Sequence, residues 1–284
     1  MDNKSNESNE VTLRSPMAQA SYSRLDYYKN CALAFNHKYV HKTATLAEPE
    51  HKDKAGNVKD PAWKRGSIIH QAMDDYINDR TQVLRPELYD LRFEIEEARA
   101  LKLSDPSRVL TEQNKFFDTD YKPIDMQALS PDQLSVTSAG DPCPKDYHVL
   151  VIIDLLIFSE DGTSAKVIDL KSGRVHSVKH SSQTQLYALF VAVEYPKVTD
   201  LTTQLWYCDQ NGKITSKDYT RKQVMIYMNF WNRLITKMHT DTSFLPNPHE
   251  QNCMFCNYGL REHSNKWVNK TGDCELSLDK RFRV

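Results

Sequence analysis

The stretch that most constrains the fold is residues 149–158, which read Val-Leu-Val-Ile-Ile-Asp-Leu-Leu-Ile-Phe and contain one polar side chain, Asp154. Such an apolar run predicts a buried strand. A second β-prone run follows at residues 165–170, and the segment between the runs contains Asp161-Gly162, a strong hairpin signal. If these two residues form the turn, the pairing register places Asp154 directly opposite Asp169.

This pair of aspartates predicts a metal site. Side chains directly opposite each other in an antiparallel pair lie about 4.5–5.5 Å apart, so two carboxylates would repel unless a cation lay between them. Lys171 projects from the same face as Asp169, because it lies two residues further along the strand. Such a group would hold Mg²⁺, lower the pKa of a bound water and offset charge on a phosphate. The alternative is a strand acid, Asp154, that pairs with Lys171 or Lys166.

The rest of the chain alternates helices and strands around this hairpin. Residues 1–19 are rich in Asn, Ser and Glu and predict a disordered leader. An amphipathic helix is expected from Ser21 onward, with Ser23 as the candidate N-cap. Further helices are expected from about Trp63, at 88–103, 181–194 and 222–238, further strands at 108–117, 201–207 and 213–219, and an irregular insertion at 118–146. We expect one domain over residues 20–245 and a Cys-rich C-terminal cap over residues 246–284.

Several short motifs together resemble the PD-(D/E)XK nuclease superfamily, and within it the RecB-like exonuclease branch. Asp154 on a strand, followed by Asp169-Leu170-Lys171, resembles the catalytic core. Other segments agree in order: Ser21-Tyr22-Ser23-Arg24-Leu25, Gly66-x-x-x-His70, Thr111-Glu112, Gln183-x-x-x-Tyr187 and Cys253-x-x-Cys256. The resemblance covers about residues 21–260. One departure is Ile152, since the family usually has glycine two residues before the first aspartate.

The resemblance implies a fold and a set of roles. The fold would be α/β, with a mixed central sheet flanked by helices (a restriction-endonuclease-like core), an N-terminal helical arm and the C-terminal cap. Asp154, Asp169 and Lys171 would be catalytic. Mg²⁺ or Mn²⁺ would be held by His70, Asp154, Asp169, the backbone carbonyl of Leu170 and Glu112, and DNA would be contacted by Ser23, Arg24, Arg174, Gln183 and Tyr187.

Each of these assignments has a simpler alternative. A lone histidine such as His70 is more often a packed or surface residue, and Glu112 lies in a polar stretch where a solvated acid is expected. Gln183 and Tyr187 share one helical face, which would also suit packing on the sheet. Ser23 could act only as a cap, and Arg174 could belong to a solvated basic loop.

Three of the six cysteines fall in the last 32 residues, and with no signal-peptide-like start we expect thiols or metal ligands rather than disulfides. The resemblance suggests that Cys31, Cys253, Cys256 and a fourth cysteine, Cys274, hold a [4Fe-4S] cluster that joins the two ends of the chain. Zinc bound by Cys253, Cys256 and either His249 or His263 is the alternative. The third interpretation is that the cysteines bind nothing.

The formal charge of −1 neither favours nor excludes a nucleic-acid partner. No apolar run is long enough to span a membrane, so we expect a cytoplasmic protein, bacterial or phage-encoded. The expected function is a metal-dependent DNA nuclease, an exonuclease acting on free ends in recombination, repair or phage DNA metabolism. The alternatives are an inactive DNA- or protein-binding module on the same fold, and a different phosphohydrolase or RNA-directed enzyme. Retention of both aspartates and the lysine argues against the inactive module.

Overall fold

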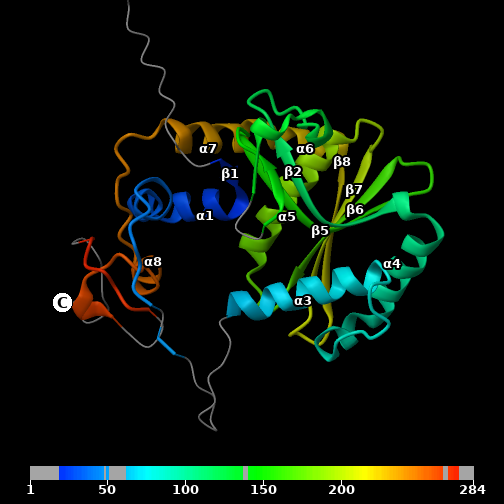
Figure 1. Cartoon of the computed structure of the whole chain (residues 1–284), viewed down its shortest axis with the longest axis horizontal. Helices are drawn as coiled ribbons and strands as arrows, with labels where there is room; N and C mark the ends of the chain where they lie inside the picture. Colours follow the sequence, from blue (N-terminus) through cyan, green and yellow to red (C-terminus); the bar gives the residue numbers. More distant parts are fainter. Residues whose placement is uncertain (1–18, 48, 51–61, 137–139, 265–267, 275–284) are drawn as a thin grey trace, which may run out of the picture.

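A computed structural model describes residues 19–47, 49–50, 62–136, 140–264 and 268–274 (Figure 1). The leader expected at residues 1–19 lies outside the described residues, except for Gln19. Residues 137–139 of the expected insertion and residues 275–284 of the cap also lie outside them.

A six-stranded mixed sheet forms the centre of the domain. Its order is β1 (Ala20–Ser21), β5 (Val149–Phe158), β6 (Ser164–Lys171), β7 (Asp200–Tyr207) and β8 (Lys213–Thr220), with β2 (Val109–Phe117) paired along the other edge of β5. β1 with β5 and β6 with β7 are parallel, and the other neighbours are antiparallel. The mixed sheet confirms the predicted fold class.

Helices cover both faces of this sheet (Figure 1). The helices α3 (Ala62–Ile77) and α4 (Arg92–Ser104) pack on one face, and α1 (Tyr22–Asn30), α5 (Ser177–Glu194), α6 (Arg221–Ile226) and α7 (Met228–Thr240) pack on the other. α5 connects the parallel strands β6 and β7, as a crossover helix must. None of the described helices has the length and hydropathy needed to cross a lipid bilayer.

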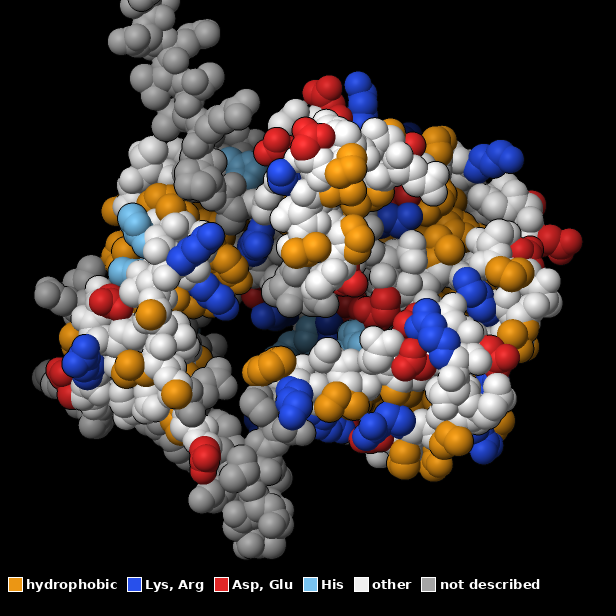
Figure 2. All heavy atoms as spheres, in the orientation of Figure 1, with side chains coloured by type: hydrophobic (Ala, Val, Ile, Leu, Met, Phe, Trp, Pro, Cys, Tyr) orange, Lys and Arg blue, Asp and Glu red, His pale blue; other side chains and the backbone are white. Residues whose placement is uncertain are grey.

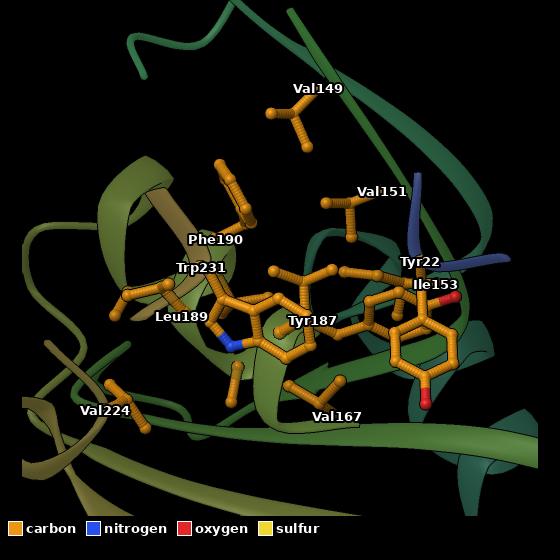
Figure 3. Packing of buried hydrophobic residues seen from close by; sticks show 14 of the residues in the cluster. Tyr22, Val149, Val151, Ile153, Val167, Tyr187, Leu189, Phe190, Val224 and Trp231 are labelled. Carbon is orange, nitrogen blue, oxygen red and sulfur yellow. The ribbon is translucent and has the colours of Figure 1, made fainter. Parts of the chain in front are cut away.

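The larger core lies between the sheet and α1, α5 and α7 (Figure 3). Val151 and Val167 of the sheet meet Tyr187 of α5 and Trp231 of α7 in this cluster. The Trp231 ring packs edge-on against Tyr22, with ring centroids 6.2 Å apart. Because these large aromatic side chains are almost fully buried, they hold the N-terminal helix against the rest of the domain.

The predicted hairpin register is confirmed. Leu155 pairs with Ile168 and Phe158 with Ala165, the pairing that an Asp161-Gly162 turn predicts. The turn itself is wider than two residues: the Ser159 N–H donates to the Ser164 carbonyl, and Gly162 adopts a φ of +70° that glycine tolerates best. The Asp161 carboxylate accepts hydrogen bonds from neighbours on both sides of the turn and so stabilises it.

Three expectations about helices need correction. The first helix is capped by Ser21, whose hydroxyl accepts the Arg24 N–H, and not by Ser23. That helix ends at Cys31, where the backbone is extended, and continues as α2 (Ala32–Phe35) and a short π-helix (Asn36–Val40). The helix expected at 222–238 is two helices, α6 and α7, that meet at Tyr227.

The remaining elements are short. The helix expected at 88–103 begins as a 3₁₀ turn (Pro86–Leu91), and further 3₁₀ turns lie at Pro106–Arg108, Met126–Ala128, Pro131–Gln133 and Arg261–His263. The expected insertion carries a small antiparallel pair, β3 (Leu134–Val136) and β4 (Pro142–Pro144). The C-terminal region contains α8 (Glu250–Met254) and lies beside residues from the N-terminal part of the chain, where the Asn269 amide donates to the Ala47 carbonyl (Figure 1).

Candidate active site

The candidate site lies where β2 and β5 are both distorted. Ile153 faces the core beneath α5, whereas Leu155, which strict alternation would place on the same face, packs beneath α3. On the neighbouring strand Glu112 has a φ of +47°, a conformation that is costly for a residue with a side chain. The pairing of β2 with β5 keeps one register on both sides of this break, so Glu112 lies opposite Asp154.

Three potential metal ligands come together at this break. His70 comes from α3, and its Nδ1 lies 3.3 Å from Oδ1 of Asp154 and 3.5 Å from Oε1 of Glu112. One ligand atom from each of the three residues lies within 4.8 Å of the others. They form the one such group that the described part of the chain contains.

Hydrogen bonding fixes the orientation of the His70 ring. Its Nε2 lies 3.1 Å from the carbonyl oxygen of Leu170, so an N–H at this position donates to the backbone and Nδ1 faces the two acids. Histidine ligands commonly bind metal through one nitrogen while the other donates to a carbonyl. Burial opposes a charge on His70, but Asp154 and Glu112 outweigh burial and raise the pKa of the imidazole to about 11.

The close approach of α3 to the sheet depends on Gly66. A Cβ atom at this position would lie 3.3 Å from Oγ of Ser172, in the segment that follows β6. Such a contact is tight, so the Ser172 side chain or the helix would have to shift by a few tenths of an ångström. The glycine therefore lets the helix approach closely enough for His70, one turn further along, to reach Leu170.

Asp154 lies at the point where β5 and β6 separate. The ladder between the two strands runs from Phe158 to Leu155 and does not include Asp154. Beyond it, Oδ2 of Asp154 accepts the N–H of Leu170 at 2.7 Å, in place of a backbone carbonyl. The side chain of Asp154 is thus fixed by one oxygen, while the other faces His70.

Asp169 and Lys171 form the second half of the site. The Lys171 ammonium lies 2.6 Å from Oδ2 of Asp169 and donates to Oε1 of Gln183 at 3.0 Å. The amide nitrogen of Gln183 in turn donates to the Tyr187 hydroxyl at 2.7 Å. This chain of contacts links β6 to α5 and holds the ammonium in one place.

The charges of the site favour a cation. Burial raises the pKa of Glu112, Asp154 raises it further, and His70 opposes the effect. Burial also raises the pKa of Asp169 against the effect of Lys171. Oε1 of Glu112 and Oδ2 of Asp169 are buried, and apart from their ion pairs with His70 and Lys171 they have no hydrogen-bond partner among the described residues. Buried carboxylate oxygens with so few partners, beside an imidazole, fit a divalent cation.

The other predicted DNA contacts lie in different surroundings. Arg174 and Ser23 are exposed, and Arg24 donates to the Gln19 carbonyl at 2.7 Å. Gln183 faces Lys171, as described above. Tyr187 is only 5% exposed and belongs to the core, so its ring offers no face on which a base could stack. In this structure the Tyr187 hydroxyl accepts from Gln183, which in turn accepts from the Lys171 ammonium.

The four cysteines predicted to bind a cluster line one cavity of about 320 Å³. Cys31 follows α1, Cys253 and Cys256 come from α8 and the residues after it, and Cys274 ends the described segment. Burial raises the pKa of the Cys256 thiol to about 11, and the other three cysteines add to this effect. The nitrogen of His249 accepts the N–H of Gln251 and caps α8.

The space-filling view shows acidic side chains and histidines gathered at the bottom of a hollow in this face (Figure 2). The structure brings together five residues that the sequence singled out: His70, Glu112, Asp154, Asp169 and Lys171. The positive φ of Glu112 has no signal in the sequence, because neither glycine nor asparagine marks the position. The role of the Leu170 N–H became visible only once the separation of the two strands was known.

The sequence model of the PD-(D/E)XK nuclease superfamily matches residues 19–260. No curated protein matches the chain. Among solved structures, SSO0001 is 12% identical over 66% of this chain and 93% of its own, with a TM-score of 0.26. A protein named "Putative exonuclease" from Eubacterium rectale is 8% identical over 84% of this chain and 87% of its own, with a TM-score of 0.37. Both scores are too low to support an argument about function.

Proposed function

Because the chain belongs to the PD-(D/E)XK nuclease superfamily, we propose that it is a DNA exonuclease of the RecB-like branch that uses a divalent metal. The observation that carries the proposal is the cluster of His70, Glu112 and Asp154 beside the Lys171 ammonium. The expected substrate is DNA with a free end, in recombination, repair or phage DNA metabolism.

His70, Glu112 and Asp154 would hold the metal, with Asp169 as a further ligand. The carbonyl of Leu170, predicted as a ligand from the resemblance, instead accepts from Nε2 of His70 on the side of the ring away from the two acids. The donor set of carboxylates and one imidazole suits Mn²⁺ or Mg²⁺. When bound, the metal would lower the pKa of a water molecule and offset the charge on the scissile phosphate. Leu170 fixes both Asp154 and His70 through its backbone, so small movements of this residue would disturb two ligands at once.

Lys171 would orient the attacking water and stabilise charge on the phosphate. Its ammonium is held between Asp169 and Gln183, and its side chain is 20% exposed, so it can reach a substrate without leaving its partners. Gln183 is a positioning residue in this scheme, because it acts through the ammonium. A hydrogen-bonded partner on a helix fixes the position of the lysine better than a solvated one would.

The test of this proposal compares cleavage of two single-stranded DNA substrates, a linear strand with an end label and a circular strand. Each is incubated with Mg²⁺, Mn²⁺ or EDTA. The variants are Lys171→Ala and Asp169→Ala. Lys166→Ala is the matched control, because Lys166 lies on the same strand but lines a separate cavity with Gln204 and Trp206. We expect metal-dependent loss of linear DNA, with circular DNA resistant, and activity abolished in the first two variants only.

Other outcomes would replace the proposal. Cleavage of circular DNA would indicate an endonuclease, and preferential cleavage of an RNA strand of the same sequence would indicate an RNA-directed enzyme. Retained DNA binding without cleavage under any metal would indicate the inactive binding module.

The cysteine cavity supports a [4Fe-4S] cluster as a second, structural cofactor in this proposal. Tetrahedral zinc with bonds of about 2.3 Å would bring its ligand atoms to within about 4 Å of one another. No group of three cysteine or histidine ligands in the described segments is that compact. Four thiols around a cavity of about 320 Å³ suit a larger group.

An absorption spectrum and metal analysis of anaerobically purified protein distinguish the two cofactors. Bound iron with a broad visible band, lost in Cys256→Ser but kept in Cys143→Ser, would support the cluster. Cys143 is a fair control because it is buried in a different part of the chain. A colourless protein with stoichiometric zinc would overturn the assignment.

A further inference from the structure

A second cavity, of about 520 Å³, lies beside the candidate active site on the same sheet face. Its floor is made by β2 and β5, and one wall is made by the β3–β4 pair of the insertion. The start of α1 contributes Arg24, and the segment before β5 contributes Lys145 and Tyr147. We call this cavity the strand groove.

The strand groove begins next to the metal ligands. Asn114 and Ile152 are paired across the two strands, and each lies two residues from an acid, Glu112 and Asp154 respectively. Val151 and Ile153 face the core beneath α5. Leu150 and Ile152 alternate with them along β5, so these groove residues lie on the face of the sheet that α5 does not cover. α3 and α4 cover this face only further along β5. The four residue-to-residue steps from Leu150 to Asp154 span about 13 Å.

The chemistry of the groove suits a nucleic-acid strand. Arg24 and Lys145 supply two cations against one acid, Asp141. Arg24 is held in place by the Gln19 carbonyl and by the Tyr39 ring, whose centroid lies 5.4 Å from the guanidinium carbon. Ile152 is 41% exposed, an unusual state for an isoleucine on a central strand. Fixed cations beside aromatic and apolar side chains are the features that bind unpaired strands without reading their sequence.

We propose that the strand groove binds an unpaired nucleic-acid strand and leads it to the acids, and that the insertion wall makes the enzyme prefer unpaired over paired substrate. The length of the floor fits up to about four nucleotide steps, at about 3.4 Å or more for each. Acidic side chains and histidines lie at the bottom of a hollow in this face (Figure 2). In this proposal a single strand enters the hollow, and the insertion wall holds off a rigid duplex. This inference deepens the proposed function and rests on it for the direction of the strand.

The test combines binding and cleavage. Binding of a fluorescently labelled eight-nucleotide DNA strand is measured by anisotropy in EDTA, for wild type, Arg24→Ala, Asn114→Ala and Ile152→Glu. The control for Ile152→Glu is Ile226→Glu, an equally charged change at an exposed isoleucine on α6. The control for Arg24→Ala is Arg92→Ala on the exposed side of α4. Thermal unfolding of each variant checks that it is folded.

We expect about tenfold weaker binding in Arg24→Ala and Ile152→Glu and no change in the two controls. The slope of log affinity against log salt should fall by about 0.7 in Arg24→Ala, as expected for one lost contact to a single-strand phosphate. Wild type should bind a blunt duplex of the same length more weakly. Equal binding by wild type and all folded groove variants, or preference for the duplex, would overturn the proposal.

A small diester separates this inference from the proposed function. Hydrolysis of bis(p-nitrophenyl) phosphate requires the metal centre but little of the groove, so the ratio of DNA cleavage to diester hydrolysis should fall about tenfold in the groove variants. If wild type cleaves both substrates and the ratio does not change, the nuclease stands and the groove fails. If wild type cleaves neither but the groove variants lose binding, the groove stands and the nuclease fails.

Discussion

Glu112→Gln should have opposite effects on stability with and without metal. Burial and the neighbouring Asp154 raise the pKa of Glu112, despite the opposing effect of His70. An acid whose folded-state pKa is raised destabilises the folded protein once the pH exceeds its unfolded pKa, and the penalty disappears as the pH falls. The side chain is 33% exposed, so screening keeps the effect to about 1 kcal/mol. In EDTA at neutral pH the variant should melt about 2–4 °C above wild type.

In the proposed site Glu112 is a metal ligand, so bound metal should reverse the sign. Changes to residues that only support a metal ligand already weaken metal binding about tenfold or more. Loss of a carboxylate ligand itself should therefore weaken metal binding at least about tenfold. At metal concentrations far above both dissociation constants, a tenfold loss removes about 1.4 kcal/mol of metal-induced stabilisation. Glu112→Gln should therefore melt no higher than wild type in excess Mn²⁺.

The assay is differential scanning calorimetry at pH 7.5 in EDTA and in excess Mn²⁺. Glu160→Gln, at an exposed position in the hairpin turn, is the control and should show no difference in either condition. A Glu112→Gln variant that is less stable than wild type in EDTA, or that gains as much stability from Mn²⁺ as wild type does, would refute the reasoning.

Three further outcomes are expected. Lys171→Met should slow cleavage at least about 100-fold while leaving the Mn²⁺-induced rise in melting temperature nearly intact, which single-turnover kinetics and scanning calorimetry would check. Trp231→Ala should cost about 3–5 kcal/mol in urea denaturation, because the ring is buried between α7 and α1. Burial lowers the pKa of His180 to about 4, so as the pH falls this histidine takes up its proton in the unfolded chain before it does so in the folded protein. The free energy of unfolding should therefore fall from about pH 6.5 towards pH 4. His180→Gln should flatten that decline in denaturation midpoints measured across this range.

The register of the β5–β6 hairpin could be predicted from its turn. Both faces of β6 are buried, with Val167 in one core and Ile168 in the other, so the apolar pattern alone does not fix the pairing. The Asp161-Gly162 turn fixes it, and the observed pairs Leu155–Ile168 and Phe158–Ala165 follow from that turn. The alternation of side chains along a strand placed Lys171 on the same face as Asp169.

Local conformations that depend on tertiary contacts could not be predicted. Ser21 and Ser23 are both good N-caps by residue type, and the choice falls on Ser21 because it also ends the short strand β1 beside Leu150. The positive φ of Glu112 is imposed by the two strands and His70 around it, not by its own preference. Strain of this kind is typically stored at functional sites, where neighbouring residues maintain it.

The separation of β5 and β6 explains how one strand can carry both core residues and a buried acid, Asp154. A ladder that continued past Leu155 would leave no place for a carboxylate between the strands. Once β6 diverges, the Leu170 N–H needs an acceptor, and Oδ2 of Asp154 supplies it at 2.7 Å. An unsatisfied buried N–H would cost about 1–3 kcal/mol, so the bond offsets part of the cost of burying the acid. The fold and the position of the acid are therefore stabilised by the same contact.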